Sequence, residues 1–172
     1  MTELSEKTPL KSARVFLVRK VEGDWVEIYL PVRPNGSTGW VSAEDVRVEP
    51  VETRITVSLS KRQLTLTLPG KDPVVASVAV GSAENPTPSG TFYVTDRVNS
   101  TNPAYGSFAL GLSAHSETLS EFGGSDGQVG IHGTDDPSSI GEAVSHGCIR
   151  VPSAVEAQLR SVPLGTPVVI TD

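Results

Sequence analysis

Residues 131–150 of the chain read IHGTDDPSSIGEAVSHGCIR and hold two of its three histidines and its single cysteine. The thiolate is the reactive form of a cysteine, and a free thiol ordinarily titrates near a pKa of ~8.5. An imidazole beside the thiol can accept its proton and hold the resulting ion pair. His132 ends a predicted strand, and the segment after it can bring Cys148 back to face it. The stretch therefore predicts Cys148 as a nucleophile and His132 as its base.

The residues next to Cys148 favour a reactive thiol over an inert one. A lone cysteine is most often a buried apolar residue, but Ser145, His146 and Arg150 make these surroundings polar and cationic. Gly147 leaves its backbone bare, so the amides of Gly147 and Cys148 can point together at a developing oxyanion. We therefore expect an oxyanion hole at this glycine.

Other polar residues near this stretch have more ordinary interpretations. Two histidines and a thiol can ligate zinc, but the sequence has no C-x-x-C or H-E-x-x-H spacing, so neither a metal nor another cofactor is predicted. His115 is expected in a loop or at the surface, outside the site. Asp135 and Asp136 precede a proline, an arrangement typical of turns and helix caps.

The block from Ser145 to Arg150, with His132 upstream, resembles the signature of the L,D-transpeptidases, the YkuD-type catalytic domain. The stretches VAVGSAENPTPSGTFYVTD at 78–96 and VPLGTPVVI at 162–170 are similar to the strands that frame the site in that family. The likeness spans residues 53–172. It implies a mostly-β, β-sandwich-like catalytic domain with a few short helices.

The resemblance also implies an activity, the formation of 3-3 cross-links between peptidoglycan stem peptides. Cys148 would attack the carbonyl of the third residue of a donor tetrapeptide, expel the terminal D-alanine and form a thioester that an acceptor amine resolves. His132 would be the base, oriented by a backbone carbonyl near Gly133 instead of by a carboxylate. The other implied site residues are His146 and Gly147 at the oxyanion hole and Ser145, Arg150 and Gly133 around the substrate.

Two alternatives stay open at this point, because nothing in the sequence distinguishes an amine acceptor from water. They are an L,D-carboxypeptidase acting on the same stem peptides and a non-catalytic cell-wall-binding protein. The partners implied are stem peptides, glycan at the N-terminal module, and carbapenem-type β-lactams that mimic the acyl donor. The implied location is extracytoplasmic, in the cell wall or periplasm. Residues 1–8 are too polar for a secretory signal, so this expectation assumes an export signal or anchor missing from this chain.

The N-terminal part predicts a separate small β module. The motifs Gly23-Asp24-Trp25 and Gly39-Trp40-Val41 resemble the bacterial Src-homology-3-like barrel. We expect this module over residues 12–50, after a flexible arm at 1–11. Trp25 and Trp40 can stack on a ligand such as glycan, but aromatic residues at these positions more often form the barrel core, which is the expectation here.

Apolar residues alternate with polar ones along much of the chain, which is typical of half-buried strands. Strands are expected at 14–20, 25–30, 39–41, 54–59, 64–68, 73–80, 91–98, 108–112, 128–132 and 168–171. The apolar run at 73–80 predicts a central strand. Two short helices are expected, at 139–144 and at 153–160, the second opening with a capping box between Ser153 and Glu156.

Charge and hydropathy exclude several partners. The formal net charge is −6, and no basic run is longer than Lys61-Arg62, whereas a nucleic-acid groove or an anionic membrane surface requires clustered cations. No stretch of 18 apolar residues is present, so no membrane span is predicted.

Overall fold

The alternating apolar residues of the C-terminal part build one large sheet. The computed structural model describes residues 3–121 and 126–172. Eight strands pair in the order β12-β10-β9-β8-β13-β4-β5-β6, and the pairing is antiparallel except for β10 with β12 and β13 with β4. The strands are β4 (Arg54–Ser58), β5 (Gln63–Thr67), β6 (Val74–Ser77), β8 (Gly90–Asn99), β9 (Phe108–His115), β10 (Gln128–His132), β12 (Ile149–Arg150) and β13 (Pro167–Thr171).

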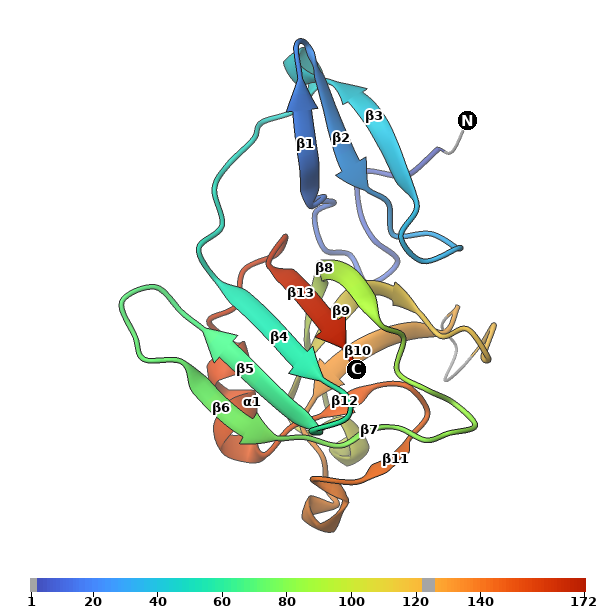
Figure 1. The fold of residues 1–172 in the computed structure, drawn as a ribbon, viewed down its shortest axis with the longest axis vertical. Coiled ribbons are helices and arrows are strands. Elements are labelled where there is room, and N and C mark those ends of the chain that lie inside the picture. The colour runs from blue at the N-terminus through green and yellow to red at the C-terminus, as the bar shows by residue number, and fades with distance from the viewer. Residues whose placement is uncertain (1–2, 122–125) are drawn as a thin grey trace.

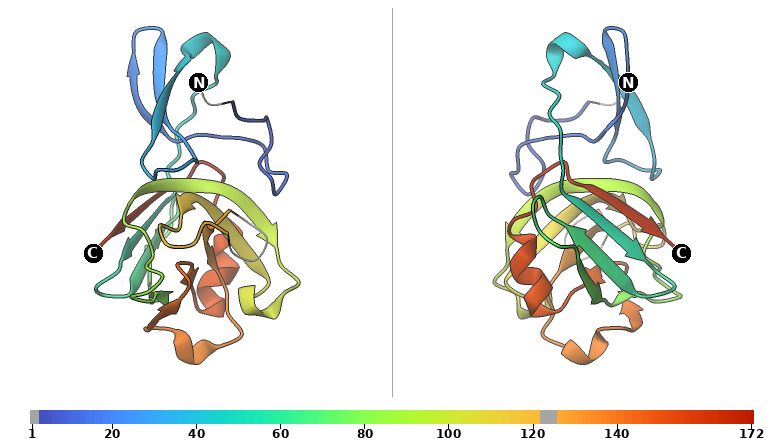
Figure 2. Two further views of the ribbon diagram at one scale, coloured as in Figure 1. Left: turned by 90° about the vertical axis from the view of Figure 1, so that its right-hand side faces the viewer. Right: turned by 60° about the vertical axis from the view of Figure 1, so that its left-hand side comes forward.

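This sheet is curved, and its two halves enclose the hydrophobic core. Ile55 and Val57 of β4 and Leu64 and Leu66 of β5 are fully buried, and they share one cluster with Leu110 of β9 from the opposite half. Figure 1 shows β13, β4, β5 and β6 in front of β8, β9 and β10, and the right-hand view of Figure 2 shows the same two layers. The predicted mostly-β, sandwich-like fold class is confirmed.

Helix α1 (Ser153–Leu159) lies where a helix was expected, but its start differs from the expectation. The residue at its N-terminal cap is Pro152, and no side chain caps it by a hydrogen bond. Glu156 turns inward instead, where its Oε1 accepts hydrogen bonds from the backbone N–H groups of Ser107 and Phe108 at 2.5 and 2.7 Å. The predicted capping box is therefore wrong, because a tertiary contact takes the glutamate.

The helix predicted at 139–144 is also wrong. A single turn of 3₁₀ helix, η3 (Pro137–Ser139), is followed by β11 (Ala143–Ser145), which pairs in parallel with β7 (Val80–Gly81). Gly141 lies between them with φ of 92°, a conformation that interrupts a right-handed helix. The other short 3₁₀ helices are η1 (Ala43–Asp45) and η2 (Pro103–Tyr105).

The apolar run at 73–80 does not form a central strand. Its first part, β6, lies at the edge of the large sheet, and Val75 on its outward face is 55% exposed. The chain leaves this sheet after Ser77, so Val78 and Val80 are buried in the crossing to β7 and not in a continuous strand. The run is apolar because both of its parts, β6 and the crossing from β6 to β7, place side chains against the core.

The N-terminal part forms a three-stranded antiparallel sheet, β1 (Val18–Glu22), β2 (Trp25–Tyr29) and β3 (Thr38–Ser42), at the top of Figure 1. Val26 and Ile28 on one face of β2 are buried. Trp40 lies opposite Glu27 in the register, so it shares the other face with Trp25, and the two indoles are 44% and 53% exposed. The expectation that both tryptophans form a core is wrong.

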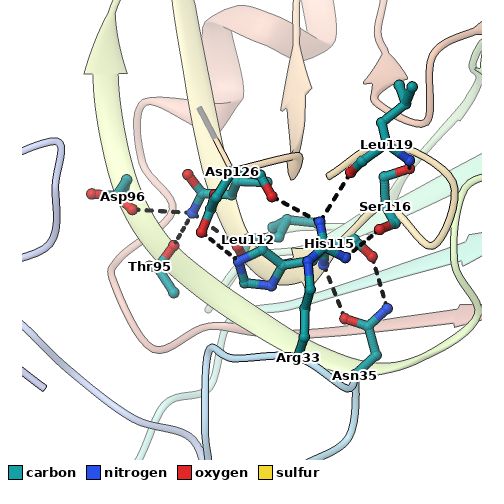
Figure 3. Close-up of polar contacts among 10 residues, drawn as sticks. Arg33, Asn35, Thr95, Asp96, Leu112, His115, Ser116, Leu119 and Asp126 are labelled. Carbon is teal, nitrogen blue, oxygen red and sulfur yellow. Dashed lines mark hydrogen bonds and ion pairs between the residues drawn. The ribbon is translucent and has the colours of Figure 1, made fainter. Parts of the chain in front are cut away.

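The loop after β2 attaches this sheet to the large one (Figure 3). The side chain of Asn35 donates to the backbone carbonyl of His115 at 2.8 Å and accepts from its N–H at 2.9 Å, as a neighbouring strand would. The guanidinium of Arg33 donates to three backbone carbonyls, those of Ser116, Leu119 and Asp126. Two side chains thus bind backbone groups at the end of β9 and at three positions between β9 and β10.

Candidate active site

The pairing of β10 with β12 brings the two ends of the decisive stretch together. The strands run in parallel with Ile131 beside Ile149 and His132 beside Arg150, and Cys148 directly precedes β12. Cys148 and His132 both line a cavity of about 380 Å³. A larger cavity of about 720 Å³, between the three-stranded sheet and residues 164–167, contains neither residue. The smaller cavity is therefore the candidate active site.

His132 is held in one orientation and is 4% exposed. Its Nδ1 lies 2.6 Å from the carbonyl oxygen of Gly133. A carbonyl can only accept, so Nδ1 carries the proton and Nε2 of the neutral ring keeps its lone pair. Burial lowers the pKa of His132, and the hydrogen bond to Gly133 is the strongest effect that opposes this; the charge of Arg150 lowers the pKa further and that of Glu156 raises it, both more weakly. The ring is thus a neutral base near neutral pH.

Cys148 is partly buried, and its Sγ accepts a hydrogen bond from the backbone N–H of Gly130 at 3.4 Å. Burial raises the pKa of the Cys148 thiol above its ordinary value, while the Gly130 N–H and the Arg150 charge oppose that rise. Burial therefore favours the uncharged form of both Cys148 and His132. The free site holds a thiol and an imidazole, and the thiolate forms when the base removes the proton.

The turn before Cys148 is closed by Ser145, which is 2% exposed. Its hydroxyl donates to the carbonyl of Cys148 at 2.5 Å and accepts from the N–H of Gly147 at 3.1 Å. Gly147 has φ of 112°, which side chains of L-amino acids rarely adopt. The side chain of Ser145, predicted to face substrate, is thus engaged in shaping the turn that carries the nucleophile.

Thr87 supports the same turn from the loop at 82–89, and no sequence pattern selected it. Its buried hydroxyl donates to the carbonyl of Gly147 at 2.8 Å and accepts from the N–H of Gly81, also at 2.8 Å. The Thr87 hydroxyl therefore both donates and accepts a hydrogen bond within this turn and its support. The only signal in the sequence was the rigid Pro86-Thr87-Pro88 setting, which is also typical of any surface loop.

The remaining predicted site residues are not among those that line the cavity. His146 is exposed, and Arg150 is half-buried beside His132. Gly133 is buried against Glu156, since a Cβ there would lie 2.5 Å from Oε2 of that carboxylate. Cys148 and His132 are the two predicted residues that the cavity brings together.

His115 and the aspartate pair lie outside the cavity. His115 is buried at the end of β9, against the expectation of a loop or surface residue, and its Nε2 is 3.2 Å from a carboxylate oxygen of Asp126. Asp136 caps η3, its side chain accepting from the N–H of Ser138, as predicted. Asp135 is exposed.

Tyr105, from η2, is a cavity residue that sequence reasoning missed. Its ring centroid is 4.7 Å from that of His132, with the planes tilted by 52°. Burial raises the pKa of the Tyr105 hydroxyl. The tyrosine forms one wall beside the base. It lies in a loop whose sequence has no periodic pattern, so only the tertiary fold reveals it.

Comparison with known proteins identifies the family. A family model described as the L,D-transpeptidase catalytic domain matches residues 52–170, which hold the large sheet up to Ile170 and the residues that line the cavity other than Leu10. The chain belongs to the L,D-transpeptidase family. It is 37% identical over 152 residues to YkuD of Bacillus licheniformis, a protein named as an L,D-transpeptidase, and the match covers 83% of this chain and 84% of that protein.

Other L,D-transpeptidase relatives agree with this assignment but are matched less fully. YkuD of Bacillus subtilis (strain 168), also named as an L,D-transpeptidase, is 38% identical over 117 residues, 67% of this chain and 64% of that protein. The solved structure of the Ldtfm–avibactam carbamoyl enzyme superimposes with a TM-score of 0.54 at 25% identity, over 72% of this chain and 50% of that one. This chain thus spans about half to two-thirds of these two proteins.

Within residues 3–121 and 126–172, no helix has the length and apolar character needed to cross a membrane.

Proposed function

We propose that this L,D-transpeptidase family member forms 3-3 cross-links between peptidoglycan stem peptides through a thioester on Cys148. The observation that carries the proposal is the shared cavity of Cys148 and His132, in which the Gly133 carbonyl fixes the proton of His132 on Nδ1. Nε2 then remains available as the base. A cysteine whose proton is removed on demand by such a base is the nucleophile that acyl transfer requires.

In the first half-reaction His132 Nε2 takes the thiol proton, and Sγ attacks the carbonyl carbon of the third residue of a donor tetrapeptide. The tetrahedral intermediate collapses, the bond to the terminal D-alanine breaks, and the leaving amine takes the proton back from His132. In the second half-reaction an acceptor amine loses a proton to His132 and attacks the thioester. The new amide forms, and Cys148 leaves as a thiolate that His132 reprotonates.

The negative charge of each intermediate develops beside the turn at residues 145–148. We assign its stabilisation to the backbone N–H groups of Gly147 and Cys148. The Gly147 N–H already has a long hydrogen bond of 3.1 Å to Ser145 Oγ, so it would share its proton between that oxygen and the substrate. Arg150 adds a positive charge that favours anions at Cys148.

The proposed substrate lies outside the cytoplasm, so we place the reaction in the cell wall or periplasm. We also propose that carbapenem-type β-lactams acylate Cys148, because they present an activated carbonyl to the same nucleophile. A similar enzyme, Ldtfm, forms a carbamoyl enzyme with avibactam. Intact-mass analysis after carbapenem treatment should show one adduct on this chain and none on the Cys148→Ala variant.

The central test is a stem-tetrapeptide assay with and without an amine acceptor. We expect D-alanine release together with a cross-linked product when the acceptor is present, and no turnover by Cys148→Ala. Release of D-alanine without a cross-linked product, even when the amine acceptor is present, would identify an L,D-carboxypeptidase instead. No turnover by the wild-type protein under either condition would overturn the proposal.

We further propose that the three-stranded sheet binds wall glycan. Trp25 and Trp40 lie half-exposed on one face, and the Lys20 ammonium is 4.9 Å from the centroid of the Trp40 ring, so the face offers aromatic surface and a donor side by side. Co-sedimentation with insoluble peptidoglycan should fall for Trp25→Ala and Trp40→Ala and stay unchanged for Val75→Ala. Equal binding by all three variants would exclude this face.

A further inference from the structure

The first residues of the chain form a closed turn beside the active site. The N–H of Thr8 donates to the carbonyl of Ser12 at 3.0 Å, and the N–H of Lys11 donates to the carbonyl of Thr8 at 2.9 Å. Lys7 and Ala13 are joined by a β-bridge below the turn. The described part of the predicted arm at residues 1–11 thus contains a turn, with Leu10 at its tip.

Leu10 reaches the cavity that holds Cys148 and His132. It is one of the residues that line this cavity, together with residues of β9 and β10, and it is 51% exposed. In the left-hand view of Figure 2 the dark-blue arm descends beside the end of β8. An apolar side chain that remains half-exposed at the mouth of a reaction cavity offers contact area to whatever enters.

A buried hydrogen bond fixes the arm in this place. The hydroxyl of Thr8 donates to Oδ1 of Asp96 in β8, and both residues are buried. The other carboxylate oxygen of Asp96 lies 3.4 Å from the amide nitrogen of Gln128 in β10. That amide also donates to Thr95 Oγ1 and to the carbonyl of Leu112, both at 2.9 Å, as Figure 3 shows around Thr95, Asp96 and Leu112.

This network is part of the cavity and not remote from it. Gln128 itself lines the cavity, as does Gly111 of β9. A Cβ at Gly111 would lie 3.0 Å from Cβ of Asp96 and 3.1 Å from Nε2 of Gln128, so the glycine provides the space in which the two side chains meet. The position of the arm is therefore coupled through Asp96 and Gln128 to the wall on which a substrate would lie.

We propose that the N-terminal arm completes the substrate site: Leu10 contacts an aliphatic group of the donor stem peptide, and Thr8 is the positioning residue that holds Leu10 there. This inference rests on the proposed function for the identity of the donor. It assigns part of the specificity to residues that precede the region matched by the family model.

The first experiment measures peptide turnover by the full chain and three variants. Leu10→Ala and Thr8→Val should each raise KM for a stem tetrapeptide about three- to tenfold, the scale of losing a small apolar contact, with kcat nearly unchanged. Thr8→Ser keeps the hydroxyl and should restore the wild-type KM. Val75→Ala, an exposed apolar position on β6 far along the sheet, is the matched control.

The second experiment reads the arm without any peptide. Cys148 is alkylated with iodoacetamide and with N-hexyl-iodoacetamide, and the ratio of the two rates is compared between variants. We call the ratio of the N-hexyl-iodoacetamide rate to the iodoacetamide rate the hexyl preference. In Leu10→Ala we expect this ratio to fall about threefold or more, the scale of one lost apolar contact, while the iodoacetamide rate is unchanged.

The two experiments separate the two possible failures. A wild-type protein that turns over no stem peptide, but whose hexyl preference depends on Leu10, would refute the proposed function and retain the arm as a cavity wall. An unchanged KM and an unchanged hexyl preference in Leu10→Ala would refute the arm proposal whatever the enzyme's substrate. A lower iodoacetamide rate in Thr8→Val but not in Thr8→Ser, without any effect of Leu10→Ala, would refute it too, since Thr8 would then act only on the fold.

Discussion

Replacing Glu156 should destabilise the catalytic sheet far more than a surface glutamate would. The Glu156 carboxylate is 8% exposed, and its Oε1 accepts from the N–H of Ser107 at 2.5 Å, from its hydroxyl at 2.9 Å and from the N–H of Phe108 at 2.7 Å. Hydrogen bonds to a charged group contribute about 1.5–3 kcal/mol each. These contributions do not simply add, because the residues share one acceptor.

The magnitude follows from what each donor can do after the carboxylate is removed. Ser107 is exposed, so water can replace its lost acceptor, whereas Phe108 is buried and its N–H is left unpaired. We expect Glu156→Ala to lower the free energy of unfolding by about 1.5–3 kcal/mol, the range for losing a hydrogen bond to a charged group, here with the buried N–H of Phe108 left unpaired. Glu156→Gln keeps an acceptor oxygen, and we expect a loss of about 1–2 kcal/mol.

Urea unfolding followed by far-UV circular dichroism measures these losses. The matched control is Glu142→Ala, whose carboxylate is exposed and only 3.6 Å from Arg62, and such surface pairs contribute about 0–1 kcal/mol. Equal losses for Glu156→Ala and Glu142→Ala, within about 0.5 kcal/mol, would refute the reasoning.

Three further outcomes are expected. His132→Ala should slow acylation of Cys148 by roughly 10²–10⁴-fold, the contribution of a positioned base, and exposed His146→Ala should cost less; the opposite ranking in a stopped-flow acylation assay would exchange their roles. Arg150 lowers the pKa of Cys148, so Arg150→Gln should move the rise of the iodoacetamide alkylation rate to higher pH, while Arg150→Lys should leave it near wild type; a shift to lower pH would contradict the sign. Thr87→Val should reduce kcat about tenfold and Thr87→Ser should restore it, because only the hydroxyl holds the Gly147 carbonyl; equal kcat in both would remove Thr87 from the site.

Strands with a clear alternation were predictable from the sequence, and β10 was predicted with the bounds that it has, Gln128–His132. The alternation of apolar and polar residues indicates which face of a strand is buried, and it can be read from the strand's own residues. The predicted helix at 139–144 failed because one glycine with positive φ outweighs the helical propensity of its neighbours. The capping box failed because a serine and a glutamate three residues apart have the same spacing whether the glutamate points to the helix start or away from it.

The candidate site divides in the same way. Cys148 and His132 were predictable because the single cysteine of the chain and a histidine lie in one short stretch, with the polar neighbours and the glycine that a reactive thiol requires. Tyr105, Thr87 and Leu10 were not, because each reaches the site from a loop whose sequence carries no period. Loops are positioned by the tertiary contacts that they make, and such contacts can join residues far apart in the sequence, as for Thr87 and Gly147, which are 60 positions apart.

Both tryptophans of the chain, Trp25 and Trp40, belong to the three-stranded sheet, and the region matched by the family model contains none. Excitation selective for tryptophan therefore makes the small sheet emit and leaves the large sheet dark. A molecule bound beside Cys148 can change that emission through the contacts that join the two parts, among them the hydrogen bonds of Arg33 and Asn35. A spectral change on adding a substrate would thus measure communication between the two sheets, and a silent spectrum would mean that the cavity fills without the small sheet responding.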